Sequence, residues 1–244
     1  MPRDRLVTTA SGARLGFADG VVTKRHRAGT SPAALLRRLD AITGAPFVQP
    51  LGPAADEDGH LVTRWPEVAL ADPDDPPWRD AGALLADLHR IHPVPTPALP
   101  EPTWPERVSR AAARTHDPTL AALGHRLTDE AAAHRGNQST LIHGDWHLGQ
   151  LGRIGDRWLL LDPDDVAVGD PWWDLARPAG FWAAGLLHDG DWREFLDGYA
   201  PAEDPWPAVD LPARCAVFVA AVRARLHSEP TADSLLSACE RMAQ

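Results

Sequence analysis

The chain has 244 residues, of which 44% are hydrophobic and 24% are charged. This composition is typical of soluble globular proteins and excludes disordered, collagen-like and coiled-coil chains. The length allows one large domain or two unequal ones. Acidic residues number 34 against 24 basic ones, and the resulting net charge of −10 argues against nucleic acid as a partner.

The sequence predicts neither a membrane span nor an export signal. The longest apolar run near the C-terminus, residues 215–222, is far shorter than the roughly 20 residues that cross a bilayer. The N-terminal residues carry charges without the apolar stretch of a signal peptide. Two cysteines are too few for a disulfide scaffold. We therefore expect a cytoplasmic protein with no membrane partner.

The N-terminal part of the chain predicts a small sheet with one helix. Ser31 is a favourable N-cap and Pro32 suits the first helical position, so a helix is expected over residues 31–42. The Asp19-Gly20 dipeptide predicts a tight hairpin turn. Strands are expected at five places, residues 6–8, 14–18, 21–24, 47–51 and 60–64.

Beyond a proline-rich link at residues 66–77 the pattern becomes mainly helical. Helices are expected within residues 81–92, 106–134 and 171–244. Between the last two lie three short apolar strands, at residues 140–142, 151–153 and 158–161, and two of them are followed by loops rich in ionisable groups. We expect an N-terminal unit over residues 1–65 and a helical unit over residues 66–244.

Lys24 is the only lysine in the chain; all other basic side chains, histidine apart, are arginines. A lone lysine indicates a position that requires a compact ammonium on a flexible stem instead of a planar guanidinium. The alternative is a single exposed lysine without a function.

The two polar loops contain a set of oxygen-bearing side chains. Asp145 and Gln150 follow the first strand, and Asp162, Asp164 and Asp165 follow the third. Carboxylate and amide oxygens are the protein ligands of hard cations, and a carboxylate can also accept a proton from a hydroxyl group. This pattern is typical of a site for Mg²⁺ and phosphates.

These loops resemble those of the aminoglycoside phosphotransferase and choline kinase-like family, which has a protein kinase-like fold. The shared residues are His143-Gly144-Asp145, then Asp162 at the end of an apolar strand, then Gly169-Asp170-Pro171 with Asp174-Leu175-Ala176. The resemblance is close over about residues 141–176 and looser elsewhere, with residues 84–95 matching a family helix. It implies an α+β two-lobe fold, with a small antiparallel-sheet N-lobe and a mostly helical C-lobe.

The resemblance also implies a role for each residue of the two loops. Asp145 would orient the acceptor hydroxyl and take its proton, and His147 would donate to the transferring phosphoryl group. Gln150 and Asp162 would hold Mg²⁺. Asp170, Asp174 and His143 are expected to brace the loops, and Asp164 is expected to be a solvated acid, with a second metal ligand as the alternative.

The nucleotide site follows from the same resemblance. Lys24 would pair with the α- and β-phosphates of ATP, and backbone groups of Arg64, Trp65, Pro66 and Glu67 would meet the adenine edge. The implied cofactors are ATP and Mg²⁺, and the implied partner is a small polar molecule that carries a hydroxyl group.

Three features depart from the common family pattern. Gln150 stands where most members have asparagine, although maltokinase-like and glucosamine kinase-like members also have glutamine there. The helix at residues 31–42 has no glutamate to pair with Lys24, and the turn at residues 11–12 is poor in glycine.

We therefore expect a small-molecule kinase that transfers the ATP γ-phosphate to a hydroxyl of an amino sugar, sugar or aminoglycoside-like substrate. The three departures keep a nucleotide-binding pseudokinase as an alternative. A metal-dependent hydrolase is a further one, because His143, Asp145 and His147 with Asp162 form a possible transition-metal ligand set. The sequence does not determine the acceptor or the oligomeric state.

Overall fold

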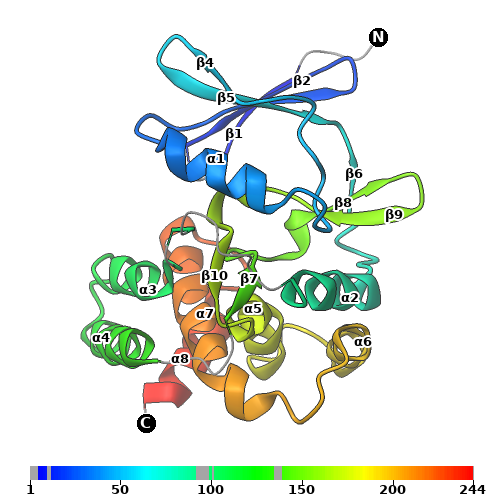
Figure 1. Ribbon diagram of the computed structural model, residues 1–244. Helices are drawn as coiled ribbons and strands as arrows, with labels where there is room; N and C mark the ends of the chain where they lie inside the picture. Colours follow the sequence, from blue (N-terminus) through cyan, green and yellow to red (C-terminus); the bar gives the residue numbers. More distant parts are fainter. Residues whose placement is uncertain (1–4, 10–11, 92–98, 101, 135–138, 244) are drawn as a thin grey trace.

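The computed structural model describes the whole chain except residues 1–4, 10–11, 92–98, 101, 135–138 and 244. Its elements form two lobes, with an antiparallel sheet and one helix above a mostly helical body (Figure 1). The predicted α+β class is confirmed. The upper sheet has the order β1-β2-β3-β5-β4, from β1 (Arg5–Thr8), β2 (Arg14–Ala18), β3 (Val21–Arg25), β4 (Ala55–Glu57) and β5 (His60–Pro66).

The local signals in the N-terminal lobe act as predicted. Asp19 and Gly20 both have positive φ, 50° and 74°, which matches the right-handed twist of the β2–β3 hairpin. Helix α1 (Pro32–Ala41) begins after Ser31, whose side chain accepts a hydrogen bond from the backbone N–H of Ala34 at 3.3 Å.

Residues 47–51 do not form the predicted strand. Phe47 makes only an isolated parallel bridge with Leu160, and the N–H of Val48 donates to the carbonyl of Leu160 at 2.9 Å. Pro46 and Pro50 flank this pairing and have no N–H to extend a ladder. The segment is instead part of the connection between α1 and β4, and it is buried at Phe47 and Val48 but exposed at Leu51, by 2%, 3% and 56%.

The C-terminal lobe has several separate helices where the sequence predicts long helical stretches. The predicted helical stretch at residues 106–134 is two helices, because Asp117 caps a new helix by accepting from the N–H groups of Thr119 and Leu120. The helices are α2 (Trp78–His89), α3 (Trp104–Ala112), α4 (Pro118–Ala133), α5 (Trp172–Ala183), α6 (Asp189–Tyr199), α7 (Trp206–His227) and α8 (Ala232–Ala243).

Short strands flank the polar loops. Strand β7 (Thr140–Ile142) pairs with β10 (Ala167–Gly169), and β8 (Leu151–Ile154) pairs with β9 (Arg157–Leu160). Strand β6 (Ala69–Leu70) extends the second pair, in the segment that the sequence predicts as a link. The predicted strands β7, β8 and β9 are confirmed. A short 3-10 turn, η1 (Leu148–Gln150), comes directly before β8, and a second one, η2 (Pro163–Asp165), comes after β9.

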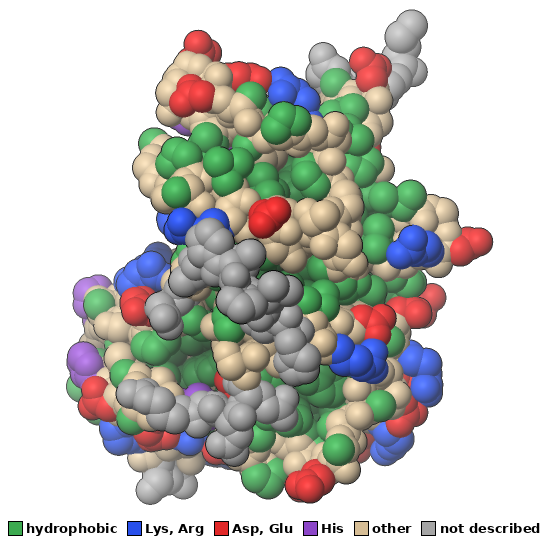
Figure 2. Space-filling view, viewed as in Figure 1, with side chains coloured by type: hydrophobic (Ala, Val, Ile, Leu, Met, Phe, Trp, Pro, Cys, Tyr) green, Lys and Arg blue, Asp and Glu red, His purple; other side chains and the backbone are tan. Residues whose placement is uncertain are grey.

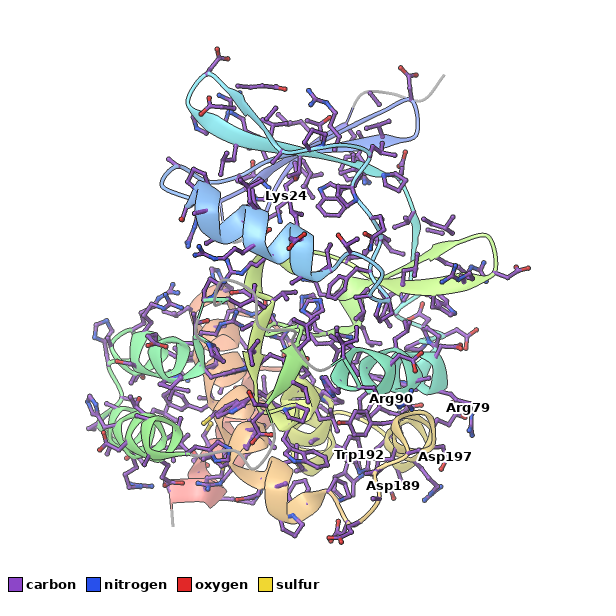
Figure 3. The ribbon with its side chains drawn as sticks, in the orientation of Figure 1. Lys24, Arg79, Arg90, Asp189, Trp192 and Asp197 are labelled. Atoms are coloured by element: carbon purple, nitrogen blue, oxygen red, sulfur yellow. The ribbon has the colours of Figure 1, made fainter. Side chains whose placement is uncertain are left out.

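Helices α2 and α6 approach each other closely through two glycines. A Cβ added at Gly198 would lie 1.9 Å from the backbone oxygen of Arg79, and one at Gly82 would lie 2.1 Å from the backbone oxygen of Phe195. The side chain of Arg79 also pairs with Asp197 at 2.9 Å (Figure 3). Side chains of both helices belong to one apolar core, which also contains Leu141 of β7, Ile42 and Phe47.

The surface mixes charges of both signs. Basic and acidic side chains are interspersed on the face shown in Figure 2. Within the described residues, none of the helices combines the length and the hydropathy needed to cross a bilayer.

Candidate active site

The two polar loops touch each other at Gly144. This residue has a φ of +80°, and a Cβ at this position would lie 2.2 Å from the backbone oxygen of Asp165. Only glycine permits both this conformation and this approach. The loop that carries Asp145 is thereby pressed against the loop that carries Asp162.

Asp174 on α5 fixes the first loop from below. Its carboxylate accepts hydrogen bonds from the backbone N–H of His143 at 2.6 Å and of Gly144 at 2.8 Å. The His89 ring lies 3.0 Å away on the same carboxylate and contacts the Tyr199 hydroxyl with its other nitrogen. Burial by itself raises the pKa of Asp174, but its bonds to His89 and His143 outweigh burial and hold the pKa below its ordinary value.

His143 and Asp170 also brace the loops. The His143 Nε2 lies 2.8 Å from the backbone oxygen of Leu161, next to Asp162, and its ring stacks on Phe47. Asp170 contacts the His134 ring at 2.7 Å and accepts from the N–H of Trp172. The structural roles predicted for Asp170, Asp174 and His143 are confirmed by these contacts.

Lys24 reaches across from β3 to the second loop. Its Nζ lies 2.5 Å from Asp162 Oδ1 and 2.7 Å from Asp164 Oδ2, and the residue is only 6% exposed. Burial by itself lowers the pKa of the ammonium, but the two carboxylates offset this and raise it above its ordinary value. The expectation that Asp164 is a solvated acid is therefore wrong, because this carboxylate is an ion-pair partner of Lys24.

A cleft of about 260 Å³ opens beside Lys24, between the N-terminal sheet and the second loop. Gln150 and Asp162 also line it, and with Trp65, Pro66 and Glu67 the cleft brings together six of the predicted site residues; Asp145 and His147 do not line it. Its walls are largely apolar. They include Leu15, Phe17, Val22, Val48, Trp65, Pro66, Glu67, Val68 and Leu161.

Arg64 does not line this cleft. Its side chain points to the other face of β5, where it pairs with Glu57 at 2.6 Å, because successive residues of a strand alternate between faces. Its carbonyl accepts from the N–H of Leu51 at 2.8 Å, and the N–H of Glu67 donates to the carbonyl of Gly20 at 2.7 Å. These two backbone groups are thus already engaged within the lobe.

The ligand set of the hydrolase hypothesis is not assembled. The His143 ring is bonded to a carbonyl oxygen, and the Nδ1 of His147 accepts from the N–H of Gly149 at 3.0 Å. Among the described residues, no three side chains of His, Cys, Asp or Glu are grouped so that they could hold a metal ion. Asp162 and Gln150 instead offer two oxygen ligands, which fits a cation that takes its remaining ligands from phosphates and water.

Asp145 is held by two arginines. Arg107 Nη1 lies 2.6 Å and Arg177 Nη2 lies 3.4 Å from its Oδ1. Arg107 also reaches Asp165 at 3.0 Å, so it ties the two loops together. Burial lowers the pKa of Arg107, but Asp145 and Asp165 outweigh burial and raise it.

The comparison with known families agrees with this geometry. Residues 21–218 match the model of the phosphotransferase enzyme family. The chain belongs to this family. Its members are ATP-dependent phosphotransferases that act on hydroxyl groups. No curated protein sequence matches this phosphotransferase significantly.

Solved structures share the fold of this phosphotransferase at low sequence identity. A choline/ethanolamine kinase family protein from Mesorhizobium loti has a TM-score of 0.66 at 14% identity, over 100% of this chain and 88% of its own. The aminoglycoside phosphotransferase APH(3'')-Id from Streptomyces rimosus has a TM-score of 0.63 at 18% identity, over 90% and 92%. Amicoumacin kinase hAmiN, in complex with AMP-PNP, Ca²⁺ and Ami, has a TM-score of 0.65 at 14% identity, over 98% and 83%.

His147 of this phosphotransferase is a neutral hydrogen-bond donor. Burial, together with the charge of Arg177, lowers the pKa of its imidazole to about 4. Because its Nδ1 accepts a hydrogen bond, the proton of the neutral ring is on Nε2. His147 can therefore donate a hydrogen bond but carries no positive charge near neutral pH.

Sequence reasoning missed the arginines around Asp145. Arg177 follows directly after the Asp174-Leu175-Ala176 motif, so its spacing from Asp174, one helical turn, was a usable signal. Arg107 lies on α3, 38 residues before Asp145, and no local pattern marks it. His26, which contacts Asp164 at 3.4 Å, was missed as well.

Proposed function

We propose that this phosphotransferase is a small-molecule kinase that transfers the γ-phosphate of ATP to a hydroxyl of an amino sugar, sugar or aminoglycoside-like substrate. The observation that carries the proposal is the convergence of Lys24, Gln150 and Asp162 on one cleft. The contact between Gly144 and Asp165 brings the loop of Asp145 against that cleft. The residues proposed to bind the nucleotide, to bind the cation and to act as the general base would thus lie next to one another.

The nucleotide would enter between the sheet and the second loop. Apolar side chains such as Val22, Val48 and Leu161 offer flat contacts for a purine ring, and Trp65 closes the same wall. Lys24 lies at the inner end with an ammonium whose charge is maintained by its acidic partners. Its natural ligand in this position is the α/β-phosphate pair.

Asp162 and Gln150 would hold Mg²⁺ through oxygen. Asp162 is accessible for this role, because its side chain is 39% exposed at the cleft. The bound ion would neutralise charge on the phosphates. Asp162 would exchange its contact with Lys24 for the ion, while the longer amide of Gln150 reaches in from η1.

Asp145 would orient the acceptor. Its carboxylate accepts a hydrogen bond from the acceptor hydroxyl and takes the proton as the oxygen bonds to phosphorus and the bond to the leaving ADP oxygen breaks. Arg107 and Arg177 fix the carboxylate in one orientation and leave its second oxygen, Oδ2, for the acceptor. The Nε2–H of His147 can donate to the transferring phosphoryl group.

A nucleotide-binding pseudokinase is the second candidate. The observation that favours it is the 2.6 Å ion pair of Arg107 with Asp145, which occupies part of the carboxylate that the reaction needs. Such a protein binds ATP but releases no ADP with any acceptor.

A screen of sugars, amino sugars and aminoglycosides with Mg·ATP, read by ADP release, separates the two candidates. For an acceptor found in this way, Asp145→Asn should remove turnover while nucleotide affinity in calorimetry is retained. Asp162→Ala should weaken Mg·ADP binding more than metal-free ADP binding. Asp40→Asn, which changes an exposed acid of α1, is the control and should match the wild type. Unchanged turnover in Asp145→Asn would contradict the assignment.

A further inference from the structure

The helix α1 does not supply an acidic partner for Lys24. Its only acid is Asp40, which is exposed. The helix contributes a basic side chain to the second loop instead, because Arg38 Nε donates to the carbonyl of Val166 at 3.0 Å. The groups that hold Lys24 must therefore come from elsewhere.

Four polar side chains lie on the face of the sheet that looks toward the second loop. Lys24 on β3 is the register partner of Thr63 on β5, so the two side chains share a face. His26 and Trp65 are each two residues further along and lie on the same face. Lys24, His26 and Thr63 are 6%, 2% and 0% exposed.

These side chains form a continuous chain of contacts that ends on Asp164. Trp65 Nε1 donates to Thr63 Oγ1 at 2.9 Å, and Thr63 Oγ1 lies 3.0 Å from His26 Nε2. His26 Nδ1 lies 3.4 Å from Asp164 Oδ2, which accepts from Lys24 at 2.7 Å.

The direction of these hydrogen bonds follows from the donors. The indole of Trp65 can only donate, so the hydroxyl of Thr63 accepts from it and has its own proton free for His26 Nε2. The carboxylate of Asp164 can only accept, so its contact with His26 requires a ring proton on Nδ1. In this arrangement Asp164 accepts from both His26 and Lys24 and donates to neither.

We propose that Asp164, oriented by His26 and Thr63, positions Lys24 in place of an acidic residue of α1. The proposal rests on the proposed kinase function, in which Asp162 is drawn toward the cation. Asp162 cannot then be the permanent partner of Lys24, whereas Asp164 is held by His26 and keeps its contact. Asp164 and His26 are positioning residues, because they act on the nucleotide only through Lys24.

The single lysine provides a direct probe of this arrangement. In protein labelled with [¹⁵N]lysine, the one side-chain resonance belongs to Lys24, and its proton exchange with water reports how firmly the ammonium is held. Asp164→Asn should speed this exchange by at least about tenfold, the size expected for the loss of one charged hydrogen bond. Asp40→Asn should leave the resonance and its exchange unchanged.

Two substitutions of His26 separate positioning from packing. His26→Asn keeps an amide donor near the place of Nδ1, while His26→Gln keeps one near Nε2, toward Thr63. His26→Asn should therefore preserve the slow exchange of Lys24, and His26→Gln should speed it, at similar melting temperatures. This pair also tests the proposal should Asp164→Asn fail to fold.

The kinetic signature is a fall in kcat without a matching rise in the KM for ATP. Asp164→Asn should lower kcat about tenfold or more because Lys24 no longer holds the phosphates in line. Removal of a neighbouring negative charge does not weaken the attraction for the phosphates, so KM should change little.

Two results would overturn the proposal. One is wild-type exchange of Lys24 in both Asp164→Asn and His26→Gln. The other is a resonance that responds only to Asp162→Asn. Since the exchange is measured on the free protein, a failure to find any acceptor would count against the kinase function and not against the role of Asp164.

Discussion

Asp174→Asn is the sharpest test of how the loop of Asp145 is held. The wild-type carboxylate is 1% exposed and accepts from two backbone N–H groups, those of His143 and Gly144, and from the ring of His89. An asparagine has the same shape but only one oxygen. Its amide group must then face one of the two backbone donors, His143 or Gly144.

The loss can be sized from these contacts. The His89 ring can change its tautomer and accept from the new amide, so it does not contribute. One backbone N–H loses a hydrogen bond to a charged group and stays buried, which costs about 1.5–3 kcal/mol, and the donor–donor contact adds roughly 1 kcal/mol. A total of about 3 kcal/mol corresponds to a fall in Tm of about 6–12 °C for a chain of this length.

Thermal unfolding followed by tryptophan fluorescence measures this shift. Asp129→Asn, at an exposed position on α4, is the matched control and should change the Tm by less than about 2 °C. Turnover should fall together with stability, since the same two donors fix the backbone next to Asp145. A fall in Tm of less than about 2 °C in Asp174→Asn would refute the reasoning, because it would mean that the two N–H groups find other partners.

Three further predictions follow from the loops. Gly144→Ala should destabilise by more than about 1 kcal/mol beyond Gly155→Ala, measured by urea unfolding, because both glycines have positive φ but only Gly144 lies against backbone; equal losses would remove the close approach as the cause. Arg107→Gln should lower kcat by about tenfold at unchanged nucleotide affinity, since it removes the ion pairs that join Arg107 to Asp145 and Asp165. A loss of nucleotide affinity at unchanged kcat would contradict the role of Arg107 in positioning Asp145. His147 should titrate near pH 4 in NMR, assigned with His147→Gln. Because its folded pKa lies below the unfolded value near 6.5, the unfolded chain binds more protons between about pH 4 and 6.5, and the stability contribution of His147 should rise with pH across that window. A midpoint near 6.5 would contradict the lowered pKa of this half-buried ring.

Local signals determined much of the fold. The Asp19-Gly20 turn and the Ser31-Pro32 helix start needed only neighbouring residues, since positive φ and an N-cap hydrogen bond are decided within one turn of chain. The family motifs around Asp145 and Asp162 could likewise be identified from the sequence, because each motif lies within a short stretch of chain. Residues 47–51 were misjudged, because a short apolar segment that makes a single bridge, at Phe47, has the same composition as a strand.

The partners of the charged groups were decided only by the tertiary structure. Lys24 meets Asp162 at a separation of 138 residues, and Arg107 meets Asp145 at 38. Although His26 is only two residues from Lys24, no pattern in the sequence predicts its contact with Asp164 or the ion pair of Asp164 with Lys24. The sequence by itself determined the family motifs and the turns and helix starts that depend on neighbouring residues. Which charges neutralise one another depended on how the two lobes pack, because an ion pair forms wherever burial leaves a charge without water and an opposite charge lies within reach.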